Sequence, residues 1–247
     1  MGCIELMPLV SCVLATRNRP RFLRQAAKYF QHQSLASSEL IIVDDSDADV
    51  QPCVPRSPAI QYIRLRERAS IGTKLNIGIR RSSGDIIQKM DDDDFYHSQF
   101  LMRTSEALLK HGGPDAIVAV DTFLVLVLGH QMLFHAGGGW CAGATLAFFR
   151  QVWERKPFRD LSYGEDGLFL DDHPEAARLR LYDPELFVAV RHGTNSWNEH
   201  VPSAGEPGGS KQAVPVTDFF LRCTPYERSV EDVLGKENAA YYRELGK

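Results

Sequence analysis

The sequence has little cysteine, no long apolar run and no large excess of either charge. Its five cysteines show no CxxC spacing, so the sequence predicts neither a disulfide framework nor a zinc cage and favours a reducing, cytoplasmic location. The longest apolar run, residues 116–128, covers only about 13 positions, whereas a helix needs about 20 to span a bilayer. No cleavable signal pattern is present. The net charge of −4 argues against a protein that coats nucleic acid.

The sequence does contain a run of four carboxylates directly after a short apolar segment. Residues 86–90 lead into Asp91, Asp92, Asp93 and Asp94. Neighbouring like charges repel one another and raise one another's pKa. An isolated acidic run is more often a solvated turn, but this one follows a buried-looking strand and therefore favours a hard cation with a phosphate on its far side.

Short apolar segments alternate with amphipathic segments in the first half of the chain. The expected strands are residues 9–15, 39–46, 60–65 and 85–90. The expected helices between them are residues 20–33 and 71–82. Strands separated by helices predict a parallel sheet with right-handed crossovers, and ligands bind such sheets beyond the carboxyl ends of the strands. We therefore expect the loops at 16–19, 44–47 and 91–94 to meet at one crevice.

The second half of the chain predicts a more antiparallel arrangement. Expected strands are residues 116–128, 131–135, 142–149, 179–182 and 186–191, with a hairpin turn at Gly129-His130. Expected helices are residues 98–110 and one or two within 226–245. Glu165 and Asp166 open a short helix, where the helix dipole favours anions. The loops around Trp140, Trp197 and residues 202–210 are candidates for substrate contact.

Four segments, in this order, resemble the family 2 glycosyltransferases, enzymes that move a sugar from a nucleotide diphosphate donor. The segments are residues 10–19, 42–46, 84–94 and 164–166. The resemblance implies an α/β GT-A (Rossmann-like) fold, with a mostly parallel central sheet flanked by helices and a smaller antiparallel portion. It implies one domain over residues 1–247, with a nucleotide-binding half (1–115), an acceptor and catalytic half (116–200) and a C-terminal part (201–247).

The resemblance also implies roles for individual residues at the donor end of the site. Asp45 would contact the base of the donor nucleotide, with Thr16, Arg17 and Lys74 also in the nucleotide site. Many relatives carry Tyr at the position of Arg17, which leaves the stacking partner of the base open.

The acid run matches the DxD motif of the family, which binds a metal ion and the donor. Asp93 would ligate Mn²⁺ or Mg²⁺ directly, and Asp91 or Asp92 would contact ribose or metal-bound water. His192 would complete the metal site, with His200 as the competing candidate, and Asp166 would be the catalytic base.

The resemblance implies metal-dependent transfer of a sugar, with inversion, from a nucleotide-diphosphate sugar. UDP-linked donors are the commonest in the family. The acceptor is left open between a saccharide, a lipid-linked glycan, a metabolite, a protein and a modified nucleic-acid base, and the sequence indicates no oligomeric state. The family's QxxRW motif is absent, which favours single transfers. The alternatives are a non-catalytic nucleotide-sugar binding module and a sugar-phosphate nucleotidyltransferase, although the latter would need a glycine-rich loop after the first strand.

Overall fold

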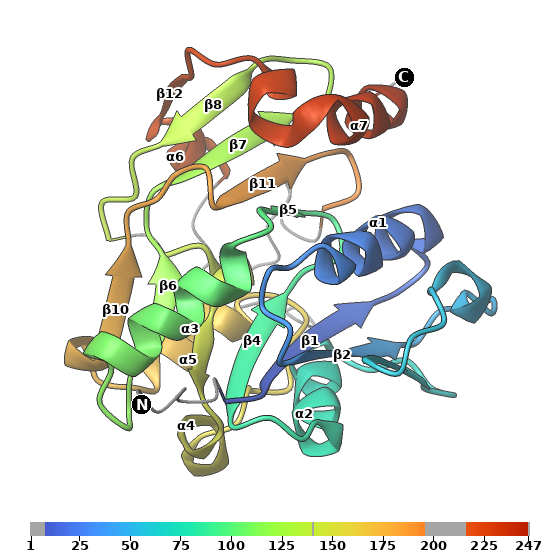
Figure 1. Ribbon diagram of the computed structural model, residues 1–247, viewed down its shortest axis with the longest axis vertical. Helices are drawn as coiled ribbons and strands as arrows, with labels where there is room; N and C mark the ends of the chain where they lie inside the picture. Colours follow the sequence, from blue (N-terminus) through green and yellow to red (C-terminus); the bar gives the residue numbers. More distant parts are fainter. Residues whose placement is uncertain (1–7, 140, 196–215, 247) are drawn as a thin grey trace, which may run out of the picture.

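The computed structural model describes residues 8–139, 141–195 and 216–246, which build two β-sheets and the helices packed on them (Figure 1). The larger sheet has the order β10 (Arg178–Leu181), β6 (Ile117–Val120), β9 (Ala147–Phe149), β4 (Ile86–Met90), β1 (Val10–Thr16), β2 (Ser38–Asp44) and β3 (Ile60–Arg64). The smaller sheet has the order β12 (Cys223–Pro225), β8 (Met132–His135), β7 (Phe123–Val127), β11 (Phe187–Arg191) and β5 (Phe95–Tyr96).

The strand pairing confirms the predicted class, a mostly parallel central sheet with a smaller, largely antiparallel one. In the larger sheet β1 is parallel to β2 and β4, β2 to β3, and β6 to β10. Only β9 runs antiparallel to its neighbours, β4 and β6. In the smaller sheet β7 and β11 are parallel, and the other pairs are antiparallel.

Helices cover both faces of the larger sheet (Figure 1), namely α1 (Pro20–Gln31), α2 (Ile71–Arg81), α3 (Phe100–His111), α4 (Arg150–Arg155) and α5 (Glu165–Asp171). The helices α6 (Val216–Phe220) and α7 (Val230–Leu245) lie beside the smaller sheet. Alternate residues of β1 point to opposite faces. Cys12 and Leu14 belong to the core cluster that contains α1 and α3, and Val13 belongs to the cluster that contains α2, α4 and α5. A continuous apolar run therefore forms β1 because both of its faces are buried.

The prediction of one strand over residues 116–128 is wrong. The chain leaves the larger sheet after β6 and enters the smaller sheet as β7, with Asp121 and Thr122 between them. Asp121 lies 3.6 Å from the guanidinium of Arg180, and its backbone N–H donates to Leu181 O at 2.8 Å. A buried carboxylate with its own partner thus interrupts the apolar run at the point where the two sheets meet.

The predicted strand over residues 142–149 is only partly correct. Its first residues form a 3₁₀ turn, η2 (Gly143–Thr145), and only Ala147–Phe149 are extended as β9. Thr145 causes this turn, because its hydroxyl donates to Ala142 O at 2.6 Å and accepts from the N–H of Val120 at 2.9 Å. The predicted hairpin at Gly129-His130 is confirmed, since β7 and β8 pair antiparallel around it.

Two short strands, β5 and β12, have no clear signal in the sequence. β5 and β12 contain only two and three residues, and each is defined by its partner strand rather than by its own pattern.

α7 begins at Val230 with a capping box between Ser229 and Asp232, and Gly235 interrupts it with a φ of 77°. None of the helices in the described part of the chain has the length and apolarity needed to cross a membrane.

Truncation of Phe148 to alanine tests the core between the larger sheet and α5. The ring of Phe148 is fully buried and lies 4.9 Å from that of Phe169, centroid to centroid. We expect the free energy of unfolding in urea to fall by about 3–5 kcal/mol, because the cavity cannot collapse fully. Leu109→Ala, on the exposed side of α3, is the control and should change it by about 0.5 kcal/mol or less. A loss below about 1 kcal/mol for Phe148→Ala would contradict this packing.

Candidate functional site

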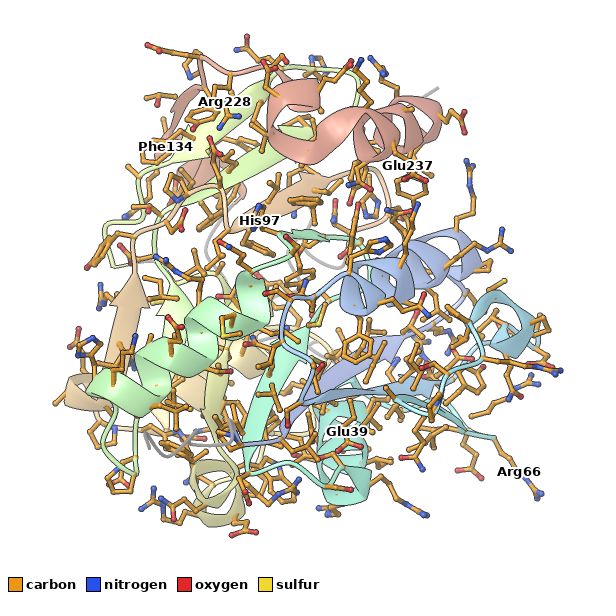
Figure 2. The ribbon with its side chains drawn as sticks, in the orientation of Figure 1. Glu39, Arg66, His97, Phe134, Arg228 and Glu237 are labelled. Atoms are coloured by element: carbon orange, nitrogen blue, oxygen red, sulfur yellow. The ribbon has the colours of Figure 1, made fainter. Side chains whose placement is uncertain are left out.

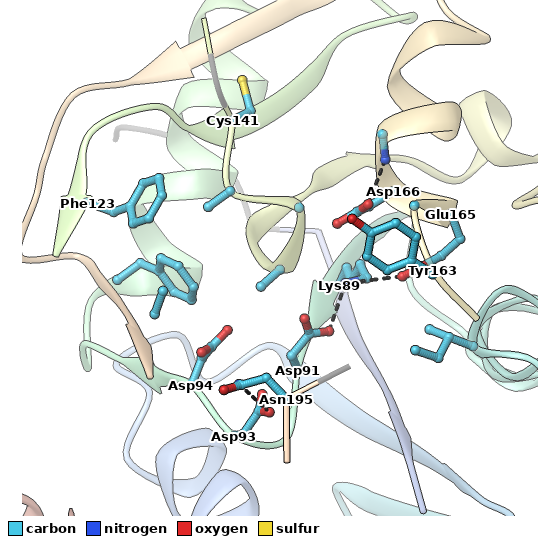
Figure 3. Close-up of a pocket in the computed structure, with 18 of the residues that line it drawn as sticks. Lys89, Asp91, Asp93, Asp94, Phe123, Cys141, Tyr163, Glu165, Asp166 and Asn195 are labelled. Atoms are coloured by element: carbon cyan, nitrogen blue, oxygen red, sulfur yellow. Dashed lines mark hydrogen bonds and ion pairs between the residues drawn. The ribbon is translucent and has the colours of Figure 1, made fainter. Parts of the chain in front are cut away.

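The loops that follow β1, β2 and β4 contact one another at the same edge of the larger sheet, as the sequence predicts. The hydroxyl of Thr16 donates to Asp92 Oδ2 at 2.6 Å, and Asn18 Nδ2 donates to Asp47 Oδ2 at 2.7 Å. A cleft of about 490 Å³ opens beside them. It is lined by the acid run 91–94 on one side and by residues 162–167 on the other (Figure 3).

Asp92 and Asp94 are buried and engaged within the protein. Asp92 accepts from Thr16 and from Arg19 Nη1 at 2.9 Å. Burial and the neighbouring charge of Asp93 nevertheless raise the pKa of Asp92 to about 6. Asp94 Oδ1 accepts from the backbone N–H of Val190 at 2.8 Å, and burial together with Asp93 raises its pKa well above the usual range. Both side chains therefore connect the acid run to other segments of the chain.

Asp93 is the most heavily contacted of the four acids. Its Oδ2 accepts from Arg19 Nη1 at 2.9 Å, from His192 Nε2 at 3.0 Å and from Asn195 Nδ2 at 3.3 Å. Burial alone would raise the pKa of Asp93, but the hydrogen bond from His192 and the charge of Arg19 outweigh it and lower the pKa. His192 Nδ1 accepts from the N–H of Thr194 at 3.2 Å, so its proton lies on Nε2, toward Asp93.

Lys89 connects the acid run to the far side of the cleft. It is 2 % exposed within β4, and its Nζ donates to Asp91 Oδ1 at 2.7 Å and lies 3.8 Å from Glu165 Oε1. Burial acts to lower the pKa of Lys89, but the charges of Asp91 and Glu165 raise it above the usual range. Burial and the charge of Asp166 raise the pKa of Glu165 to about 8. The lysine thus stays charged between two acidic elements.

Asp166 faces the cleft from the first turn of α5 (Figure 3). Gly164 precedes this helix with a φ of 70°, a conformation that favours glycine, and so allows the chain to turn sharply into α5. Asp166 Oδ1 accepts from the backbone N–H of Gly167 at 2.7 Å. The predicted base and the acid run therefore line the same cleft from different elements.

The four predicted nucleotide-site residues lie together where β1 and β2 end. Lys74 Nζ donates to Asp45 Oδ1 at 2.7 Å and to Thr16 O at 2.9 Å, and Arg17 Nη1 lies 3.9 Å from Asp45 Oδ2. The N–H of Ala69 also donates to Asp45 Oδ2, at 2.9 Å. The side chain of Asp45 is only 1 % exposed, so both of its oxygens are engaged inside the protein.

Most of the basic side chains that precede the acid run do not reach it. Arg64, Arg66 and Arg68 are exposed, and Arg66 extends away from the molecule beyond β3 (Figure 2). Arg19 alone among the arginines that follow β1 bridges two of the acids, Asp92 and Asp93.

The side chains at the cleft that could ligate a metal fit a hard cation that takes few ligands from the protein. Among the described residues no three His, Cys, Asp or Glu side chains form a ready-made metal cluster. Mg²⁺ and similar ions usually keep several waters and bind through one or two carboxylates and substrate phosphates. Asp91 and Asp93 provide carboxylates of this kind beside the cleft, with His192 next to Asp93. The residues present therefore fit a cation that is bound together with a diphosphate.

Three residues that contact the acid run are absent from the sequence-based set. Lys89 has a detectable signal, because it is a charge inside an otherwise apolar strand that leads into acids. Arg19 follows the first strand, but nothing in its spacing distinguishes it from Arg17 or Arg21. Asn195 has no sequence signal, since only the path of the chain after β11 brings it to Asp93.

Other predicted contacts lie outside the described residues. These are Trp140, Trp197, His200 and the loop 202–210.

Comparison with known proteins identifies relatives of both the sequence and the fold. The model of glycosyl transferase family 2 matches residues 11–125. An uncharacterized glycosyltransferase of Haemophilus influenzae is 24% identical over 210 residues, which cover 76% of this chain and 80% of that protein.

Two solved structures share the fold at low sequence identity. TarS of S. aureus, residues 1–349 in complex with UDP-GlcNAc, has a TM-score of 0.60 and 13% identity. The mannosyltransferase PcManGT of Pyrobaculum calidifontis, in complex with GDP-Man and Mn²⁺, has a TM-score of 0.57 and 16% identity. Each match covers 76% of this chain, and the chain spans 60% and 57% of these two proteins.

The matched family, the glycosyltransferase relatives and the common architecture agree with one another. Together they support a family 2 glycosyltransferase, and the chain has the GT-A fold.

Proposed function

We propose that this protein transfers a sugar from a nucleotide-diphosphate sugar to an acceptor hydroxyl, with inversion at the anomeric carbon and with the help of a divalent cation. The observation that carries the proposal is the shared cleft. Acids suited to a cation and diphosphate line one side of it, and Asp166 lines the other. A single displacement needs this arrangement, because the leaving group and the base act on opposite sides of the reacting carbon.

Asp166 is the general base of the proposed reaction. It takes the proton of the acceptor hydroxyl as that oxygen forms a bond to the anomeric carbon. The bond between the anomeric carbon and the diphosphate oxygen breaks in the same step, and the bonding electrons leave with the diphosphate. Asp166 Oδ1 is held by the N–H of Gly167, which fixes the orientation of the carboxylate at the start of α5.

Negative charge that develops on the diphosphate has two proposed sources of stabilisation. A divalent cation, held by Asp91 and Asp93 with His192 beside them, would supply positive charge there when bound. Arg19 supplies a permanent positive charge at the same end of the cleft, since its guanidinium lies 2.9 Å from both Asp92 and Asp93. This arginine is thus proposed as a contact of the donor diphosphate.

The donor nucleotide is proposed to lie beyond the ends of β1 and β2. Thr16, Arg17 and Lys74 surround this position, and Asp45 is the proposed contact of the base. Because Lys74 and Ala69 already engage Asp45, the base would meet a carboxylate whose charge is partly compensated. We propose UDP as the nucleotide, which TarS binds as UDP-GlcNAc, although PcManGT binds GDP-Man. The melting temperature in a panel of UDP- and GDP-sugars with Mn²⁺ distinguishes the two, because only a bound donor stabilises the folded state.

Removal of divalent cations tests the cation requirement. In EDTA we expect the release of nucleoside diphosphate, measured with donor and acceptor present, to fall by at least about 100-fold, because the cation contributes several kcal/mol to the transition state. Added Mn²⁺ or Mg²⁺ in excess of the chelator should restore it. Transfer at an undiminished rate by metal-free protein would exclude this part of the proposal.

Substitution of the proposed base tests the role of Asp166. We expect Asp166→Asn to lower kcat by about 10²–10⁴, because the amide cannot accept the proton. The donor should still raise the melting temperature of the variant as it does that of the wild type. Asp115→Asn, at an exposed site in the turn between α3 and β6, is the matched control and should keep full activity. Loss of the donor-induced shift in Asp166→Asn would assign the residue to binding instead of proton transfer.

Arg19→Met tests the proposed contact with the diphosphate. The substitution keeps an unbranched side chain and removes the charge, so we expect the donor KM to rise about tenfold or more, as for the loss of a hydrogen bond to a charged group. Arg21→Met, exposed in the first turn of α1, is the control and should leave KM unchanged. An unchanged donor KM in Arg19→Met would show that this arginine only neutralises the acids.

A further inference from the structure

Gly143 lies directly beneath the carboxylate of Asp166. It is the first residue of η2 and lines the cleft. A Cβ atom at this position would lie 1.5 Å from Asp166 Oδ2, 2.3 Å from its Cγ and 2.8 Å from its Cβ. These distances are far below van der Waals contact. The carboxylate therefore occupies the space that any side chain at position 143 would fill.

The backbone at Gly143 does not itself require glycine. The φ of Gly143 lies outside the left-handed range, whereas Gly137 and Gly164 have φ values within it. An alanine could adopt the same backbone conformation without strain. The close approach of Asp166 is thus the feature that excludes a larger residue here.

The turn that carries Gly143 cannot easily move away from the carboxylate. Thr145 is fully buried, and its hydroxyl is bonded to Ala142 O and to the N–H of Val120. Tyr96 donates its hydroxyl to Ala144 O at 3.1 Å, and Gln88 Nε2 donates to Thr145 O at 3.0 Å. Buried hydrogen bonds of this kind are costly to break, so the turn forms a rigid floor.

The carboxylate has little freedom on its other side. Its Oδ1 accepts from the N–H of Gly167, which leaves Oδ2 as the oxygen that lies over Gly143. Relief of a contact at position 143 would require rotation of the Asp166 side chain away from its present rotamer. The hydrogen bond to Gly167 would then be lost, and the oxygen would move relative to the cleft.

We propose that Gly143 is a positioning residue, whose missing side chain provides the space in which the carboxylate of Asp166 is held for proton transfer. The inference rests on the proposed role of Asp166 as the base. In this account Gly143 contacts neither the donor nor the acceptor, and it acts only through Asp166. A displacement of about 1 Å at a reacting group is enough to lower a rate about 100-fold.

Gly143→Ala is the direct test, read out as separate effects on kcat and on donor KM. We expect kcat to fall about 100-fold, with the donor KM within twofold of the wild type, because the nucleotide site lies on other elements. Gly113→Ala is the matched control, since a Cβ there meets no atom within 4 Å and the residue lies outside the cleft. Its kcat should stay within twofold. A kcat within twofold for Gly143→Ala would overturn the proposal.

A double-mutant cycle with Asp166→Asn separates this inference from the proposed function. If Gly143 acts only through Asp166, Gly143→Ala should lower the residual rate of Asp166→Asn by no more than twofold, although it lowers the wild-type rate strongly. Equal losses in the two backgrounds would overturn the positioning role. An Asp166→Asn variant with full activity would instead refute the proposed function, and with it this inference.

A stability cycle keeps the inference falsifiable if Gly143→Ala folds poorly. Truncation by Asp166→Ala removes the carboxylate that an alanine at 143 would meet. The loss of melting temperature caused by Gly143→Ala should therefore be at least halved in the Asp166→Ala background. A loss of the same size in both backgrounds would show that the two side chains do not compete for this space.

Discussion

Four carboxylates at the end of one buried strand must each be stabilised, and the segments that do so define the cleft. Thr16, the last residue of β1, and Arg19 just after it hold Asp92, whereas Asp94 accepts a hydrogen bond from β11. Asp93 accepts from Arg19 and from two side chains that follow β11, and Lys89 holds Asp91 from within β4. Burial of unpaired charge costs several kcal/mol, so these contacts draw distant segments to one point. The acid run thus organises the surrounding chain as well as its proposed cation.

The two sides of the cleft differ in what fixes them. The acid side is fixed by hydrogen bonds to its carboxylates, from Lys89 to Asp91, from Arg19 to Asp92 and Asp93, and from β11 to Asp94. The side that carries Asp166 is fixed by space and by backbone, through the tight turn at Gly164 and the floor at Gly143. Lys89 connects the two sides electrostatically, since it lies near both Asp91 and Glu165. Proton transfer and leaving-group stabilisation are therefore proposed to depend on one shared geometry.

The sequence predicts the elements that carry regular patterns and the residues at strand ends. The strands β1, β2 and β4 and the helix that opens with Glu165 and Asp166 follow from apolar runs and acid placement, and parallel order then brings the strand ends together. The division of residues 116–128 between two sheets could not be predicted, because its cause is the pairing of Asp121 with a distant arginine. The engagement of Asp45 by Lys74 also depends on three-dimensional packing, for which single-sequence patterns contain no information.

The link between β6 and β7 has an evolutionary consequence. Only Asp121 and Thr122 separate the two strands, and the match to the family model ends at residue 125, inside β7. The portion before this link contains the acid run, and the portion after it contains Asp166. Both portions contribute to both sheets, because β9 and β10 return to the larger sheet after the link, and β5, which precedes the link, pairs with β11 in the smaller sheet. Exchange of either portion between related genes would therefore require both sheets to re-form across the new junction.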